Sequence, residues 1–203
     1  MQFIVGVDEV GRGPLAGPVA VGAVAIPTPA SAKIRALHKK FFQGIKDSKQ
    51  LTPDERELWY SLALESKKRG ELNFRVSLVS EKVIDRHGIS YALKLGIKRC
   101  LKGLNLDLKS QIFLDGSLRA PKKFKHQLTV IKGDEKISVI SLASIVAKVV
   151  RDRLMVKVAK KFPEFNFEIN KGYGTLTHRR ALEKYGLTAV HRRTFLTRLT
   201  VGK

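Results

Sequence analysis

Long apolar runs near the start of the chain predict strands that are covered on both faces. Residues 3–8 and 19–26 are rich in valine and lack the polar alternation of a half-exposed strand. Residues 72–78 instead alternate apolar and polar side chains, which predicts a strand with one exposed face. The short apolar segments 111–114 and 127–131 predict two further strands.

Helical patterns fill much of the remaining chain. Thr52, Pro53 and Glu55 form a capping-box sequence that predicts a helix start, and Gly70 ends this helix. Apolar positions at helical spacing predict further helices at 80–87, 90–103 and 139–161, one that ends near Tyr185, and a last short basic helix. The segment from 27 to about 51 is predicted to be a basic loop. Strands interleaved with helices indicate an α/β fold.

The composition indicates a single folded domain with a polyanionic partner. The chain has 203 residues, 43% of them hydrophobic, which suffices for one substantial core and argues against disorder. Its 39 lysines and arginines outnumber 18 acidic residues, giving a formal net charge of +21. Neutralising phosphates releases counterions and drives binding to nucleic acid, although a generally basic or ribosome-associated protein would show the same surplus. Between Ser141 and Lys203 fourteen basic residues oppose four acidic ones, so this third is the predicted duplex-binding surface.

The cysteine and histidine content excludes several kinds of site. Cys100 is the single cysteine, so the chain has no intramolecular disulfide and no thiolate metal cluster, and we expect this residue to be buried. The histidines show no close ligand spacing, which argues against zinc. We expect surface or capping roles for all five, which are His38, His87, His126, His178 and His191.

An uncharged stretch from Gly13 to Ala32 has the length of a membrane span. Prolines and glycines interrupt it throughout. The residues that precede it are acidic rather than basic, which argues against a signal peptide. We therefore expect a soluble cytoplasmic protein with no membrane partner.

Two adjacent carboxylates, Asp8 and Glu9, stand at the end of the first apolar run, and Gly11, Arg12 and Gly13 follow at once. Carboxylates at a strand end suit a hard cation such as Mg²⁺, which prefers oxygen ligands. Glycines let a ligand approach the backbone closely, and the arginine adds a positive charge beside it. The segment predicts a metal site with a nucleic-acid backbone laid against it.

Two other interpretations of this segment deserve comparison. Each half taken alone is also typical of an ordinary strand end and an ordinary turn. A dinucleotide-binding loop is excluded because the spacing of Gly11, Gly13 and Gly17 is one residue too long and Pro14 interrupts it. Such a loop also needs an acidic residue about 20 positions further on, and none occurs between Glu9 and Asp47.

The segment Asp8–Pro18 as a whole resembles the opening motif of the ribonuclease HII family. Further matches follow in the family's order along almost the full chain: Asp47-Ser48-Lys49, Leu114-Asp115-Gly116, Lys132-Gly133-Asp134, Ser141-Leu142-Ala143-Ser144-Ile145-Val146-Ala147-Lys148, Arg151-Asp152 and Lys171-Gly172-Tyr173-Gly174-Thr175. The resemblance implies a ribonuclease H-like fold, with a mixed five-stranded sheet flanked by helices. It also implies one catalytic domain over residues 1–203, of which about 165–203 form a basic helical C-terminal extension.

The resemblance assigns the metal-binding and catalytic roles to Asp8, Glu9, Asp115 and Asp134. Phosphodiester hydrolysis by a pair of divalent ions requires such a group of carboxylates from separate parts of the chain. Because strand neighbours face opposite sides, we expect Glu9 to lie at a bend or to use its backbone carbonyl. Asp134 adjoins Glu135, and only the resemblance selects between them. Both Mg²⁺ and Mn²⁺ accept these ligands.

Substrate choice must rest on the ribose 2′-hydroxyl, which distinguishes RNA from DNA. By resemblance, the Gly11-Arg12-Gly13 backbone and Tyr173 together sense the junction where a ribonucleotide is followed by deoxyribose. Weaker candidates rest on charge: Lys49 and Lys148 for phosphate contacts, and Arg192-Arg193 for the duplex backbone. Asp152 is interpreted as structural and paired with a neighbouring arginine.

The predicted function is that of a monomeric, metal-dependent endoribonuclease. It would hydrolyse the RNA strand of RNA/DNA hybrids and cut duplex DNA on the 5′ side of embedded ribonucleotides, leaving 5′-phosphate and 3′-hydroxyl ends. The alternatives are a non-catalytic basic nucleic-acid-binding protein on the same fold, a ribonuclease HIII and a junction-resolving nuclease. The complete carboxylate set argues against the non-catalytic protein. Arg12 and the short segment before Asp8 argue against a ribonuclease HIII. The ribose sensor argues against a junction-resolving nuclease. Residues 199–203 are expected to be disordered.

Overall fold

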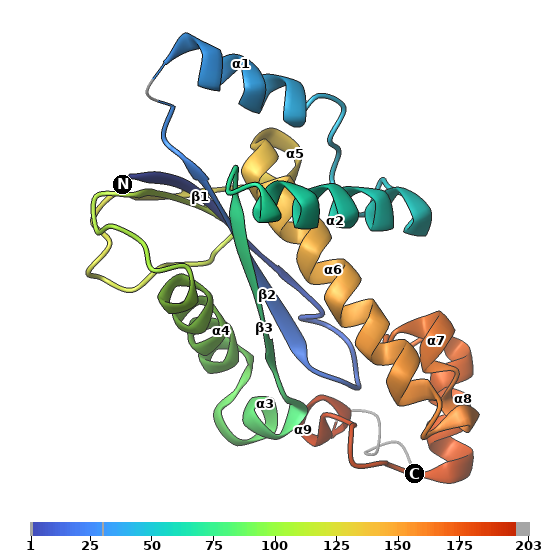
Figure 1. Cartoon of the computed structure of the whole chain (residues 1–203). Helices are drawn as coiled ribbons and strands as arrows, with labels where there is room; N and C mark the ends of the chain where they lie inside the picture. Colours follow the sequence, from blue (N-terminus) through green and yellow to red (C-terminus); the bar gives the residue numbers. More distant parts are fainter. Residues whose placement is uncertain (1, 30, 198–203) are drawn as a thin grey trace.

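A five-stranded sheet with the strand order β3-β2-β1-β4-β5 forms the centre of the fold (Figure 1). The computed structural model describes residues 2–29 and 31–197. The strands are β1 (Phe3–Val10), β2 (Val19–Pro27), β3 (Asn73–Val79), β4 (Gln111–Asp115) and β5 (Gln127–Val130). β1, β2 and β3 pair antiparallel, whereas β4 runs parallel to β1 and β5 parallel to β4. The sheet is therefore mixed, as the resemblance implied.

The helices cover both faces of this sheet. They are α1 (Ala32–Phe41), α2 (Pro53–Lys68), α3 (Glu81–His87), α4 (Ile89–Gly103), α5 (Gly133–Lys136), α6 (Ser138–Ala159), α7 (Phe167–Asn170), α8 (Leu176–Tyr185) and α9 (Arg193–Leu196), with a 3-10 turn η1 at Pro163–Phe165. Along β2, Val21 and Ala23 belong to the core shared with α4, whereas Val24 packs in the core with α6. Apolar residues on both faces explain why β2 shows no polar alternation.

Helix α6 lies in direct contact with the backbone of β1 and β2. A Cβ atom on Gly6 would lie 2.3 Å from the Val139 carbonyl oxygen, and one on Gly22 would lie 2.2 Å from that of Ala143. Only residues without a side chain permit this approach. The helix is buried along most of its length as a result, and it reaches from α5 to the C-terminal helices (Figure 1).

The C-terminal segment packs on the far end of α6. Met155 and Ala159 of α6 form a separate apolar cluster with Phe165 and Phe167, and Ala16 from the glycine-rich loop joins it. α7 and α8 lie beside this end of α6 in Figure 1. The helical extension is thus connected through one core both to α6 and to the loop that follows β1.

The sequence predicted all five strands and the helices longer than one turn, except α1. The loop prediction for 27–51 is wrong because Ala32–Phe41 is helical. This helix has no acidic residue in its first turn, and its last turn packs the Phe41 ring edge-on against Trp59 of α2 at 6.0 Å. Tertiary contact rather than local signal stabilises it. The expected disorder of 199–203 lies outside the described residues.

Within residues 2–29 and 31–197, no helix combines the length and the apolar character that crossing a membrane requires. The uncharged stretch from Gly13 to Ala32 supplies the glycine-rich loop and β2 instead. Cys100 is buried, as expected, and its thiol lies 3.2 Å from the Val21 carbonyl oxygen.

Replacing Gly22 with alanine should destabilise the fold. The new methyl group would force α6 away from β2, and overpacking of this kind costs about 3 kcal/mol. Gly103→Ala is the matched control, since its Cβ would meet only the flexible Arg75 side chain, at 3.4 Å. Urea unfolding measures both. A loss for Gly22→Ala no larger than that for Gly103→Ala would contradict the direct contact of α6 with the sheet.

Candidate active site

Asp8, Glu9 and Asp115 meet where the sheet divides. The β1–β4 ladder ends at the pair Val7–Leu114, beyond which β1 continues beside β2 and β4 beside β5. The three carboxylates each offer an oxygen, and these oxygens lie within 4.8 Å of one another. Glu9 reaches this group with its side-chain carboxylate from within β1, next to the last residue of the strand.

Burial makes this carboxylate group unfavourable in its ionised form. Asp8 is 4% exposed, and desolvation, followed by the charges of Glu9 and Asp115, raises its pKa well above the ordinary value. Desolvation raises the pKa of Glu9 to about 7, against the opposing effect of Arg12, whose guanidinium lies 3.6 Å from the Glu9 carboxylate. Glu9 Oε2 is buried and has no hydrogen-bond partner. Such an acceptor-rich group fits a hard divalent cation.

Neighbouring elements hold the carboxylates in place. The Ser144 hydroxyl of α6 hydrogen-bonds Asp8 and lies 2.8 Å from the Ser48 hydroxyl. The Gly133 backbone N–H donates to Asp115 Oδ1 at 2.7 Å. The site is therefore assembled by three segments that are distant in the sequence: the Ser48 loop, the start of α5 and the middle of α6.

Asp134 lies beside this group rather than inside it. It is buried in α5, and Lys49 Nζ donates to its Oδ2 at 3.1 Å. The Ser141 hydroxyl donates to the Asp134 carbonyl oxygen at 2.6 Å, which ties α5 to α6. The structure thus brings three of the four predicted carboxylates together and pairs the fourth with a lysine. The metal-binding role of Asp134 stays a prediction.

A cavity of about 250 Å³ opens onto the carboxylates. Its lining contains every predicted site residue except Asp134: Asp8, Glu9, Gly11, Arg12, Gly13, Lys49, Asp115, Lys148 and Tyr173. Tyr173 is 41% exposed. The glycine loop and the tyrosine, which are far apart in the chain, therefore share one cavity with the acidic group.

Two buried arginines fix the glycine loop. Arg192 donates to the carbonyl oxygens of Gly11 at 2.7 Å, Arg12 at 2.9 Å and Gly17 at 2.8 Å. Arg151 Nε donates to Pro18 O at 2.9 Å. Arg192 has 0% exposure, and burial, then the Arg151 charge, lowers its pKa to about 9. The predicted duplex contact of Arg192 is therefore wrong, because the side chain faces inward.

The two outer glycines of the motif differ in what the fold requires of them. Gly11 has φ of +86°, and a Cβ there would lie 2.1 Å from Arg151 Nε. Gly13 has no atom within 4 Å of its would-be Cβ. The fold therefore requires glycine at position 11, whereas Gly13 lines the cavity and has free space beside it.

Two further expectations need correction. Asp152 pairs with Lys148 at 2.8 Å, not with an arginine, so Lys148 carries a local counter-charge. Burial lowers the Lys148 pKa, and that ion pair opposes the shift. His178 and His191 are 0% and 2% exposed, which contradicts the surface roles expected for all five histidines. Their Nε2 atoms lie 3.0 Å apart.

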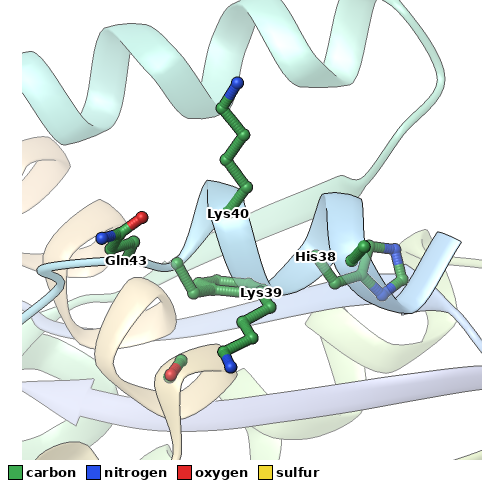
Figure 2. A pocket seen from close by; sticks show the side chains of 7 residues that line it. His38, Lys39, Lys40 and Gln43 are labelled. Carbon is green, nitrogen blue, oxygen red and sulfur yellow. The ribbon is translucent and has the colours of Figure 1, made fainter. Parts of the chain in front are cut away.

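A larger cavity of about 620 Å³ lies beside α1 and the first residue of α6 (Figure 2). Its lining consists of Ala36, His38, Lys39, Lys40, Phe42, Gln43 and Ser138. Lys39 and Lys40 extend in opposite directions from α1 in Figure 2. The lining carries no carboxylate, so this cavity offers a divalent cation none of the ligands that the smaller one provides.

The sequence did not identify the residues that hold the carboxylates and the glycine loop in place. Ser48, Ser144 and Arg151 lie within matched motifs, and that position was their only signal. Buried arginines and histidines cannot be recognised from charge, since the same residue types are ordinarily exposed. The arginines bind backbone carbonyls, which leave no trace in the sequence.

Comparisons with known proteins agree with this geometry. The sequence model of the family described as Ribonuclease HII matches residues 5–198. Ribonuclease HII of Caldicellulosiruptor bescii is 41% identical over 196 residues, covering 96% of this chain and 87% of the relative. The crystal structure of ribonuclease H2 from Pyrococcus horikoshii OT3 has a TM-score of 0.73 at 30% identity, covering 95% of this chain and 93% of that one. Ribonuclease HII from Archaeoglobus fulgidus, solved in complex with PCNA, has a TM-score of 0.68 at 27% identity, with 94% of both chains covered.

Replacing Glu9 with glutamine should stabilise the metal-free protein at pH 8. Because the folded pKa of Glu9 is raised from 4.5 to about 7, the folded state binds more protons than the unfolded state between these values. Wild-type stability therefore falls as the pH rises through this window, and the variant escapes that loss. Urea unfolding in EDTA should show a gain of about 1–3 kcal/mol at pH 8 and a smaller one at pH 5. An unchanged free energy of unfolding at pH 8 would contradict the raised pKa of Glu9 in the folded state.

Arg192 and Arg193 offer a matched pair of variants. Arg192→Gln leaves the carbonyls of the glycine loop without their donors and should cost about 3–5 kcal/mol of unfolding free energy. Arg193→Gln removes the same charge from an exposed side chain and should change stability by less than about 0.5 kcal/mol. Equal effects of the two substitutions in urea unfolding would mean that the buried contacts contribute nothing beyond charge.

Proposed function

Because the chain belongs to the ribonuclease HII family and is accordingly a ribonuclease H, we propose that it cuts the RNA strand of RNA/DNA hybrids and the 5′ side of ribonucleotides embedded in duplex DNA. The products carry 5′-phosphate and 3′-hydroxyl ends. The single observation that carries this proposal is the shared cavity, in which three carboxylates face the glycine loop and Tyr173.

Asp8, Glu9 and Asp115 are the residues that would hold divalent ions, with Asp134 completing the set. The buried Glu9 oxygen without a partner supports this assignment, as do the raised pKa values of Asp8 and Glu9. When bound, Mg²⁺ or Mn²⁺ supplies an activated water and shields the charge of the phosphate, with a pair of ions serving both purposes. Lys49, 3.1 Å from Asp134, can exchange this partner for a phosphate oxygen.

The remaining residues position the substrate strand. Arg12 is half exposed beside Glu9 and presents a guanidinium to a phosphate at the cavity rim. The backbone around Gly13 is open, so a ribose 2′-hydroxyl can approach its polar groups. Tyr173 lines the same cavity and can stack on a sugar or base. These contacts test for ribose at the scissile position, and the carboxylate group performs hydrolysis beside it.

Cations beside the site extend the interaction along the duplex. A groove between α2 and the α6–α7 region is lined by both charged types, with a basic excess: Arg56, Lys148, Arg153, Lys157, Lys160 and Lys171 against Glu57, Asp152 and Glu168. Such a surface binds phosphates without regard to sequence. The proposed site residues all belong to one chain, so a monomer would suffice for this reaction.

Cleavage of a labelled DNA duplex that carries one ribonucleotide tests the proposal. With Mg²⁺ or Mn²⁺ we expect a single cut on the 5′ side of the ribonucleotide, and no cut in an all-DNA duplex. Asp115→Asn keeps the acceptor for the Gly133 N–H but removes one charge, and its rate should fall by about 10³-fold or more. EDTA should abolish cleavage by the wild-type protein.

Each contrary result has a definite meaning. Binding without metal-dependent cleavage would favour the alternative, a non-catalytic basic nucleic-acid-binding protein. Cleavage of the all-DNA duplex would contradict the ribose-sensing role of the glycine loop and Tyr173. Full activity of Asp115→Asn would remove that residue from the metal site.

A further inference from the structure

His178 and His191 form a buried pair that the chemistry above does not use. His178 lies in α8 and His191 in the segment before α9, and their Nε2 atoms are 3.0 Å apart. Phe165 and Phe167 surround them, with ring centroids between 4.9 and 6.0 Å from those of the histidines. Burial lowers the pKa of both rings, that of His191 to about 4. Both are therefore neutral at physiological pH.

The surrounding hydrogen bonds fix the direction of this pair. The Thr188 backbone N–H donates to His191 Nδ1 at 2.9 Å, so this nitrogen is an acceptor. In a neutral ring the proton must then be on Nε2, which donates to His178 Nε2. His178 in turn carries its proton on Nδ1, which donates to the Tyr173 carbonyl oxygen at 2.9 Å. One tautomer of each ring satisfies every contact, and the chain of donors ends at Tyr173.

The same segments are tied to the glycine-rich loop. Ala16 pairs with His191 in an antiparallel bridge, where the Arg192 N–H donates to Leu15 O at 2.8 Å. The Leu15 N–H donates to Gly172 O, also at 2.8 Å. Hydrogen bonds therefore connect the loop after β1, the turn before Tyr173 and the His191 segment into one unit.

The backbone before Tyr173 needs such support. Lys171 has φ of +51° and Gly172 has φ of +85°, so two consecutive residues are in the left-handed region. For a lysine this conformation is strained and persists only when its surroundings hold it. A phenylalanine would fill the position of His178 without the cost of burying a polar ring. What histidine adds is the directed bond to the carbonyl oxygen of Tyr173.

We propose that His178 and His191 are positioning residues, which hold Tyr173 in register with the glycine loop and thereby set the preference for a ribonucleotide followed by deoxyribose. The inference rests on the proposed function of that loop and tyrosine. Neither histidine touches the substrate. Their side chains act on Tyr173 through its carbonyl oxygen, which His178 Nδ1 binds at 2.9 Å.

Two amide substitutions of His178 separate its two hydrogen bonds. His178→Asn places an N–H donor near the position of Nδ1 and keeps the bond to Tyr173, whereas His178→Gln reaches only the position of Nε2 and keeps the contact with His191. Both remove the ring. His126→Asn is the control, since His126 is exposed and immediately precedes β5 in the chain. For each variant we would measure the thermal midpoint and the cleavage rates on a duplex with one ribonucleotide and on a uniform RNA/DNA hybrid.

The ratio of the two rates is the decisive quantity. His178→Gln should lower the single-ribonucleotide rate by about 10-fold or more relative to the hybrid rate, because a small displacement of a positioned group has effects of this size. His178→Asn and His126→Asn should keep the wild-type ratio. His178→Phe should behave like His178→Gln.

Other outcomes overturn the inference. A parallel fall of both rates that follows the thermal midpoint would reduce the pair to a packing role. Equal loss of the ratio in the asparagine and glutamine variants would mean that the bond to Tyr173 is not what matters. If the wild-type protein cleaves neither substrate, the proposed function itself is wrong. This outcome is distinct from any effect of the variants, because it is observed in the wild-type protein.

Discussion

The contact of α6 with the backbone of β1 and β2 is the constraint on which the site depends. Gly6 and Gly22 let the helix approach so closely that its polar side chains reach the ends of the strands. Ser144 then meets Asp8, Ser141 holds α5, and Arg151 enters the glycine-rich loop. A wider separation would leave these partners without contact, even if the apolar core remained intact.

The same contact resolves a conflict between folding and chemistry. Buried carboxylates next to one another destabilise a metal-free protein, as the raised pKa values of Asp8 and Glu9 show. An apolar frame on both faces of the sheet offsets this destabilisation, since β2 is buried except for Pro27 and β1 is buried over most of its length. The fork between β1 and β4 brings carboxylates from both strands together beside a cavity.

The sequence predicted the frame well because its signals are local. Valine-rich runs identified β1 and β2, and the capping box at Thr52 is present with both of its hydrogen bonds. The resemblance then predicted the mixed sheet and the residues around the cavity. The sequence did not predict helix α1, because the stability of this helix comes from contact with α2. It did not predict the partner of Asp152, because a lysine four residues earlier competes with two adjacent arginines. The first depends on tertiary geometry that no local pattern encodes, whereas the second is an i,i+4 pair that helical spacing allows.

Net charge overstates the exposed basic surface of the C-terminal third. The basic surplus of the C-terminal third predicts a duplex-binding surface there. Yet Arg151 and Arg192 are fully buried, and Lys148 is paired with Asp152. Both arginines donate hydrogen bonds to backbone carbonyls, so they hold the glycine loop instead of contacting phosphates. Net charge therefore indicates nucleic-acid affinity only after the internal cations are subtracted, and in this fold the buried arginines hold the glycine loop.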